Sequence, residues 1–137
     1  MSEPASRPRP QFRNLSLSQI LSYRLPPAAK TSILHRISGV LLFLALPLVV
    51  VPLFAHSITS PQSFASMAQW AGHPLSKLIF LVLIWAYMHH FCAGIRYLTL
   101  DMHIGNDREP SQRSGVMVLG ISLALTFIFA LKLFGVW

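Results

Sequence analysis

Three long apolar stretches constrain the fold of this 137-residue chain more than any other feature. A helix needs about 20 mostly apolar residues to cross the hydrocarbon core of a membrane, and each stretch is long enough. Helices are expected because a backbone in lipid must satisfy its own hydrogen bonds. We therefore predict an all-α integral membrane protein with three transmembrane helices, at about residues 30–56, 75–100 and 115–137. Residues 1–29 form an N-terminal arm, and residues 30–137 form the membrane domain.

The composition agrees with a membrane location and argues against nucleic acid as a partner. Hydrophobic residues make up 53% of the chain and charged residues only 11%, whereas soluble domains average about 25% charged residues. Lysine and arginine number 11 against 4 acids, but these cations flank the apolar stretches, so membrane lipid is the expected contact. The single cysteine, Cys92, excludes an intrachain disulfide and a cysteine-only metal site.

Features between and within the stretches predict further local structure. Pro47 and Pro52 interrupt the first stretch and predict a helix that is disturbed near Pro47. In the polar connection that follows, Phe64, Met67 and Trp70 lie at helical spacing, which predicts a short interfacial helix. Residues 105–107, Gly-Asn-Asp, predict a turn in the second connection.

The distribution of cations predicts the orientation of the chain. Cytoplasmic segments next to membrane helices are enriched in lysine and arginine. The first connection has neither residue between His56 and His73. We therefore expect the N-terminus and the second connection in the cytoplasm, and the first connection and Trp137 outside. The residues that decide this are Arg7, Arg9, Arg13, Arg24, Lys30, Arg36, Arg96, Arg108 and Arg113.

One polar cluster lies at the start of the first stretch. Ser32, His35, Arg36 and Gly39 are spaced by one to two helical turns and share one helix face. Arg36 and His35 could simply anchor the helix at the membrane surface. Alternatively, the face could form a pocket for a ligand with carbonyl or carboxylate oxygens, because ionisable groups in membrane helices are usually functional.

A second cluster contains adjacent histidines in the second stretch. His89 and His90 point about 100° apart on a helix and cannot bind one metal ion from the same face. His90, Gly94 and Tyr97 form a stripe, and the glycine leaves room for a flat macrocycle such as haem b, which takes axial imidazoles. A histidine that bonds to a neighbouring helix is the alternative.

These residues match a known family. The chain resembles the larger cytochrome b membrane anchors of succinate:quinone oxidoreductases (succinate dehydrogenase, respiratory complex II) over most of its length. The matching features are Arg9-Pro10, Asn14-Leu15, the string Ser32-Ile33-Leu34-His35-Arg36-Ile37-Ser38-Gly39, three spans, and His90 followed by Gly94-Ile95-Arg96 and Asp101. Tyr97 is a departure, since the family often has histidine there.

The resemblance implies a function and a set of sites. His90 would be the axial ligand of the iron of haem b, Ser32 and Arg36 would line a ubiquinone site, and His35 and Arg36 would lie near the haem propionates. The chain would be a subunit of the enzyme with no succinate site and no catalytic residue of its own. A flavoprotein subunit and an iron–sulfur subunit would deliver the electrons, and a small membrane anchor would supply the second haem ligand.

Other functions stay open at this stage. One alternative is a haem-free structural anchor of a fumarate reductase-type complex. A small transporter or channel subunit is less favoured, because the outer halves of the first and third stretches are almost entirely apolar. The arginines of the arm are compatible with a mitochondrial presequence. The resemblance begins near Arg9, however, which favours a multi-pass protein of a bacterial inner membrane over one of the mitochondrial inner membrane.

Overall fold

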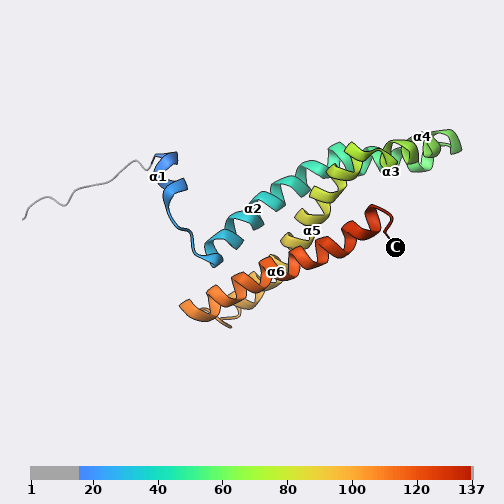
Figure 1. The fold of residues 1–137 in the computed structure, drawn as a ribbon. Coiled ribbons are helices and arrows are strands. Elements are labelled where there is room, and N and C mark those ends of the chain that lie inside the picture. The colour runs from blue at the N-terminus through green and yellow to red at the C-terminus, as the bar shows by residue number, and fades with distance from the viewer. Residues whose placement is uncertain (1–15, 137) are drawn as a thin grey trace, which may run out of the picture.

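The structure, a computed structural model, describes residues 16–136, and its regular elements in this range are all helices. Their path is shown in Figure 1. In chain order they are α1 (Leu17–Ser22), α2 (Pro27–Ala45), a π-helix η1 (Leu46–Val50), α3 (Val51–Thr59), α4 (Pro61–Gly72), α5 (Pro74–Asp101) and α6 (Arg108–Leu133). The arginines at positions 7, 9 and 13, the motif residues 9–10 and 14–15, and Trp137 lie outside the described residues.

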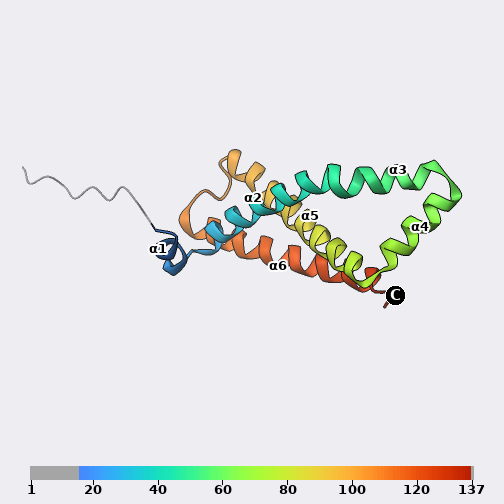
Figure 2. The same cartoon turned by 90° about the horizontal axis from the view of Figure 1, so that it is seen from above.

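Three helical segments are long and apolar enough to cross a membrane, namely Pro27–Thr59, Pro74–Asp101 and Arg108–Leu133. This confirms the predicted all-α fold with three spanning helices. The third segment begins at Arg108, before the predicted span at residue 115, because the helix continues into the polar connection. Figures 1 and 2 show α5 and α6 side by side and antiparallel, with α2 crossing both.

The three spanning helices pack through small and polar side chains. The buried residues of the described chain include Ala45, Ala86, Ala93 and Val118, together with hydroxyl residues and His89. Large apolar side chains such as Phe43 and Leu48 are instead exposed, at 75% and 71%. Membrane helices associate through small residues and interhelical hydrogen bonds, and lipid or another chain covers their large apolar side chains. The packing is thus that of a membrane bundle.

The first spanning segment contains the disturbance predicted at Pro47, in the form of a π-helix. Proline lacks the amide hydrogen that an α-helix needs and crowds the preceding turn. Over Leu46–Val50 each backbone hydrogen bond spans one residue more than in an α-helix, and the α-helix resumes as α3 at Val51. A wider turn accommodates the proline without ending the helix.

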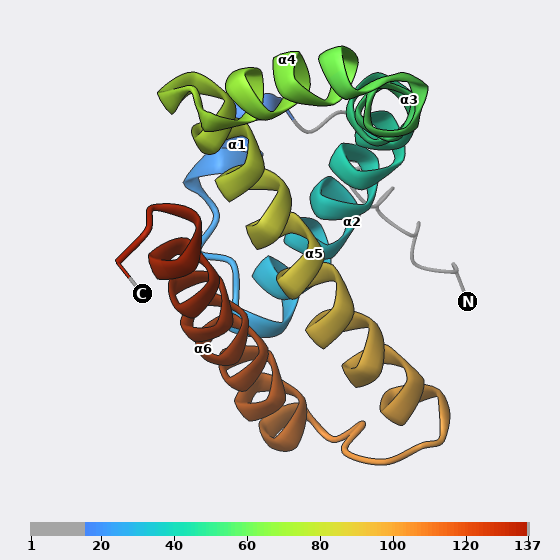
Figure 3. The same ribbon diagram turned by 90° about the vertical axis from the view of Figure 1, so that its right-hand side faces the viewer.

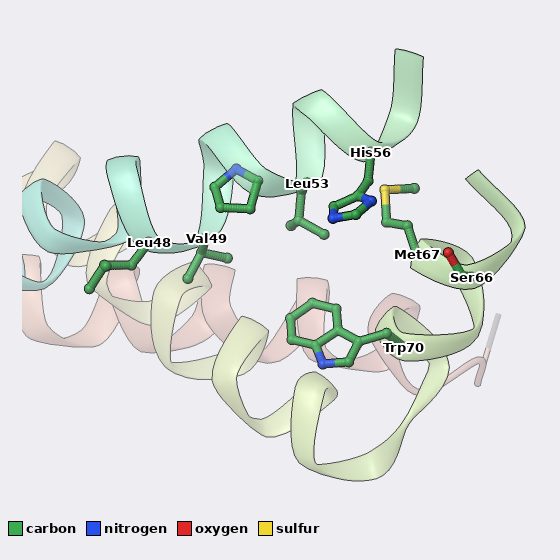
Figure 4. A pocket seen from close by; sticks show the side chains of 8 residues that line it. Leu48, Val49, Leu53, His56, Ser66, Met67 and Trp70 are labelled. Carbon is green, nitrogen blue, oxygen red and sulfur yellow. The ribbon is translucent and has the colours of Figure 1, made fainter. Parts of the chain in front are cut away.

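The predicted short helix is confirmed as α4, which follows α3 after one residue. Ser60 caps it by accepting a hydrogen bond from the Ser63 backbone N–H at 3.1 Å, and Pro61 occupies its first turn. Figure 3 shows α4 running across one end of the bundle, from α3 to α5. A pocket of about 350 Å³ lies between η1, α3 and α4 at this end, lined mainly by apolar residues with His56 and Trp70 (Figure 4).

The opposite end of the bundle is held together where α2 begins. The Ala28 backbone N–H donates to Gln112 Oε1 of α6 at 3.1 Å, and the Thr31 hydroxyl donates to the Gly115 carbonyl at 3.1 Å. A Cβ atom at Gly115 would lie 3.0 Å from the Ala28 backbone, so only glycine permits this close approach. These contacts fix how α2 is rotated against its neighbours. The predicted turn at 105–107 is confirmed nearby, with Gly105 at φ +76°.

Candidate functional site

His90 of α5 lies against α2, where one turn of α2 forms a seat for its imidazole. The Nδ1 atom of His90 is 3.1 Å from the backbone carbonyl oxygen of His35 and 3.3 Å from the hydroxyl of Ser38. The Ser38 hydroxyl donates to the same carbonyl oxygen at 2.9 Å. Ser38 is fully buried. We call Ser38, Gly39 and the His35 carbonyl the imidazole seat.

This geometry decides which ring nitrogen of His90 has the proton. A carbonyl oxygen can only accept a hydrogen bond. Nδ1 must therefore be protonated to donate to the His35 carbonyl, because an unprotonated Nδ1 would place two lone pairs face to face. The neutral ring then has its lone pair on Nε2. Histidines that bind metal ions usually have this arrangement, with the second nitrogen donating to a backbone carbonyl or carboxylate.

Two glycines of the predicted site have different surroundings. A Cβ atom at Gly39 would lie 3.0 Å from His90 Cε1 and 3.4 Å from Nδ1, so the seat requires glycine there. Gly94 lies one turn after His90, and a Cβ at this position would meet nothing within 4 Å. The sequence predicted free space at Gly94. It placed Gly39 on the polar face but did not predict the contact with His90.

Three rings form a cluster at the interface between α2 and α5, in which His35 contacts both His90 and Tyr97. The His35 and His90 rings are parallel, with centroids 4.1 Å apart and planes at 18°. The Tyr97 ring follows, 5.1 Å from that of His35. The Tyr97 hydroxyl is buried and has no hydrogen-bond partner among the described residues. The structure thus brings His35 to His90, and it places Tyr97 beside His35.

Ser32 and Arg36 lie on the same part of α2 but take no part in the contacts that join His35, Ser38 and Gly39 to His90. Ser32 is half-buried and Arg36 is exposed. Within residues 16–136 neither side chain forms a hydrogen bond or an ion pair. Burial therefore differs across the polar face predicted from the sequence. His35 and Gly39 pack against α5, whereas the Arg36 guanidinium is exposed. That exposed edge is free to contact a ligand or another chain.

His89 has a different environment from its neighbour. It is fully buried between the spanning helices, with Nδ1 3.3 Å from the hydroxyl of Ser122 on α6. Its ring is nearly parallel to that of Trp85, with centroids 5.8 Å apart. The sequence left open, as an alternative, a histidine that bonds to a neighbouring helix. Both histidines form such a contact, His89 with α6 and His90 with α2.

The described part of the chain offers no cluster of side chains for a metal ion. Within residues 16–136 no group of three or more His, Cys, Asp or Glu side chains is arranged to bind one. A haem iron needs only axial ligands from protein, because the macrocycle fills the other positions. One imidazole with a free Nε2 beside an open glycine fits that need. The pocket of Figure 4 lies at the other end of the first spanning segment, away from this cluster.

Comparison with known proteins identifies the relatives of the chain. Residues 6–129 match the model of the family described as succinate dehydrogenase/fumarate reductase transmembrane subunit. The succinate dehydrogenase cytochrome b556 subunit of Paracoccus denitrificans is 36% identical over 82% of this chain and 85% of its own length. The subunit of the same name from Coxiella burnetii is 34% identical over 90% of this chain and 93% of its own length.

Proposed function

The chain belongs to the family of succinate dehydrogenase/fumarate reductase transmembrane subunits, and we propose that it is the haem b- and ubiquinone-binding anchor of a succinate dehydrogenase. In this role it helps to pass electrons from an iron–sulfur subunit to ubiquinone. Succinate itself is oxidised on a separate flavoprotein subunit. The chain is then a subunit of the enzyme without catalytic activity of its own, and it belongs to a bacterial inner membrane. Its relatives in Paracoccus and Coxiella support that location.

The observation that carries the proposal is the hydrogen bond between His90 Nδ1 and the His35 carbonyl. It leaves the lone pair on Nε2, orients the ring and increases the basicity of Nε2. An unshared nitrogen does not by itself distinguish His90, because the buried Nε2 of His89 also has no hydrogen-bond partner within residues 16–136. His90 differs in that its ring is only half-buried and can be reached by a ligand. His90 would thus hold the haem iron, and Gly94 would leave room for the edge of the macrocycle. When bound, haem b supplies a one-electron redox centre.

The proposed quinone site uses the exposed edge of α2. Ser32 and Arg36 are one helical turn apart, so both can face one small ligand. The Arg36 guanidinium supplies a fixed positive charge that favours negative charge on a quinone oxygen during reduction. The Ser32 hydroxyl can donate a hydrogen bond to a carbonyl group and accept or release a proton. We also propose that the adjacent residues His35 and Arg36 lie near the haem propionates.

The proposed orientation places this edge at the cytoplasmic side of the membrane. Arg24, Lys30 and Arg36 surround the start of the first spanning segment, and Arg108 and Arg113 lie at the start of α6. The connection between α3 and α5 contains no lysine or arginine between His56 and His73. The positive-inside rule supports a cytoplasmic N-terminus and an outward C-terminus. The iron–sulfur subunit would then dock near the half-buried Ser32 and the exposed Arg36.

A spectrum of the purified complex tests the haem ligand. We expect a reduced-minus-oxidised haem b band in the wild type and its loss in His90→Ala, with the subunit still present in the membrane. His56→Ala is the matched control, because His56 is exposed at the other end of the first spanning segment. An unchanged band in His90→Ala would overturn the ligand assignment. A wild-type complex without any haem band would favour the alternative, a haem-free anchor of a fumarate reductase-type complex.

A further inference from the structure

The His35 carbonyl oxygen is shared by two side-chain donors. His90 Nδ1–H donates to it at 3.1 Å and the Ser38 hydroxyl at 2.9 Å. Ser38 Oγ is also 3.3 Å from His90 Nδ1. The three atoms therefore form a closed triangle of hydrogen-bond contacts. Ser38 is fully buried, so bulk water does not compete for its hydrogen bonds.

Sharing of this oxygen weakens the hydrogen bond that polarises His90. A carbonyl oxygen that already accepts from a hydroxyl has less electron density to offer a second donor. A strong bond from Nδ1–H makes the imidazole more like an imidazolate and a stronger donor at Nε2. The Ser38 hydroxyl reduces that effect. In a buried site these differences are larger than they would be in water.

We propose that Ser38 tunes the reduction potential of the haem through the His35 carbonyl, as a positioning residue that does not touch the haem. The inference rests on the proposed function, because it requires His90 to be the axial ligand. A weaker imidazole donor stabilises Fe(III) less, so the Ser38 hydroxyl raises the potential. Hydrogen bonds to the axial ligand are one of the means by which proteins set haem potentials.

The test is a redox titration of the haem band in the purified complex. In Ser38→Ala the His35 carbonyl loses its hydroxyl donor, so the hydrogen bond from His90 Nδ1–H should strengthen, and the midpoint potential is expected to shift to a more negative value. Ser38→Thr keeps a hydroxyl and is expected to restore the wild-type potential. Ser38→Cys supplies a weaker donor and is expected to fall between the wild type and the alanine variant. It also gives a measurable protein if alanine impairs assembly.

Ser122→Ala is the matched control. Ser122 is also fully buried, and its hydroxyl is also 3.3 Å from a histidine Nδ1, but that histidine is His89. The control should leave the haem potential unchanged. An unchanged or more positive potential in Ser38→Ala, or an equal shift in Ser122→Ala, would overturn the inference while the haem site stands. Absence of haem from the wild-type complex would instead overturn the proposed function.

Discussion

Adjacent histidines on α5 have opposite environments, and this difference decides which of them is available to a ligand. His89 is enclosed by the spanning helices and bonds to Ser122. His90 is half-buried, with Nδ1 held by α2. The sequence predicted that the two rings diverge and favoured His90 because Gly94 follows it by one turn. It could not predict the tautomer, since that depends on the rotation of α2 against α5.

At Gly39, we predict that a single added methyl group disturbs haem binding. The Cβ of Gly39→Ala would lie 3.0 Å from His90 Cε1, so the ring must tilt or α2 must move. Such overpacking costs about 1–3 kcal/mol. The haem-to-protein ratio of the purified complex should fall below that of the wild type. Gly72→Ala is the control, because nothing lies within 4 Å of its added Cβ. Equal haem content in both variants would contradict the prediction.

Arg36 gives a second prediction at the scale of a single residue. Its guanidinium is exposed and has no ion-pair partner within residues 16–136. Arg36→Leu should lower the rate of quinone reduction by roughly 100-fold, the order expected when one donor to a developing negative charge is lost. Succinate oxidation with an artificial electron acceptor should persist. An equal loss of both activities would indicate failed assembly and would contradict the proposed role.

At the scale of elements, the helices could be predicted but their mutual rotation could not. Apolar length indicated the three spanning segments, and spacing of Phe64, Met67 and Trp70 indicated α4. Pro47 marked the place of the irregularity, although proline is compatible with both a kink and a π-helix. The imidazole seat was not predicted, because it needs one face of α2 to meet one face of α5. Close contacts such as that between Gly115 and Ala28 set this rotation.

Arg96 joins two of these elements, which leads to a prediction about α6. The side chain is only 6% exposed, and it donates from Nε to the Ser114 hydroxyl and from Nη2 to Ser111. Lysine keeps the charge but cannot form this fork of hydrogen bonds. Arg96→Lys should lose about 2 kcal/mol of stability and speed up hydrogen exchange in the first turns of α6. Arg113→Lys is the control, since Arg113 is exposed and pairs only with Glu109 of the same helix. Similar hydrogen-exchange rates in both variants would show that the hydrogen bonds of Arg96 do not stabilise the start of α6.

On the scale of the whole molecule, the bundle exposes large apolar side chains that lipid or another chain must cover. Its buried residues are small or polar, whereas Phe43, Phe54 and Phe127 are all more than half exposed. Toward α4, the first spanning segment separates from α5, as Figures 2 and 3 show. Lipid alone could cover such a surface. Under the proposed function, we expect the surface near the imidazole seat, with His90 and the exposed Arg36, to be covered by other subunits.

The positions of the other histidines lead to the last prediction, that this chain does not hold six-coordinate haem by itself. The His35 ring lies flat on His90 at 4.1 Å and cannot also bind the iron from the opposite face. His89 is enclosed on another side of α5. His56 and His73 lie at the α4 end of the bundle, and His103 lies in the turn after α5. We therefore predict that the second axial ligand comes from another chain. Expressed alone, the chain should bind little haem. Expression together with the small anchor should give one six-coordinate haem per pair, measured by its absorption and electron paramagnetic resonance spectra. Substitution of the ligand histidine in the small anchor should reproduce the loss of haem expected in His90→Ala. Stoichiometric six-coordinate haem in the chain alone would contradict the prediction.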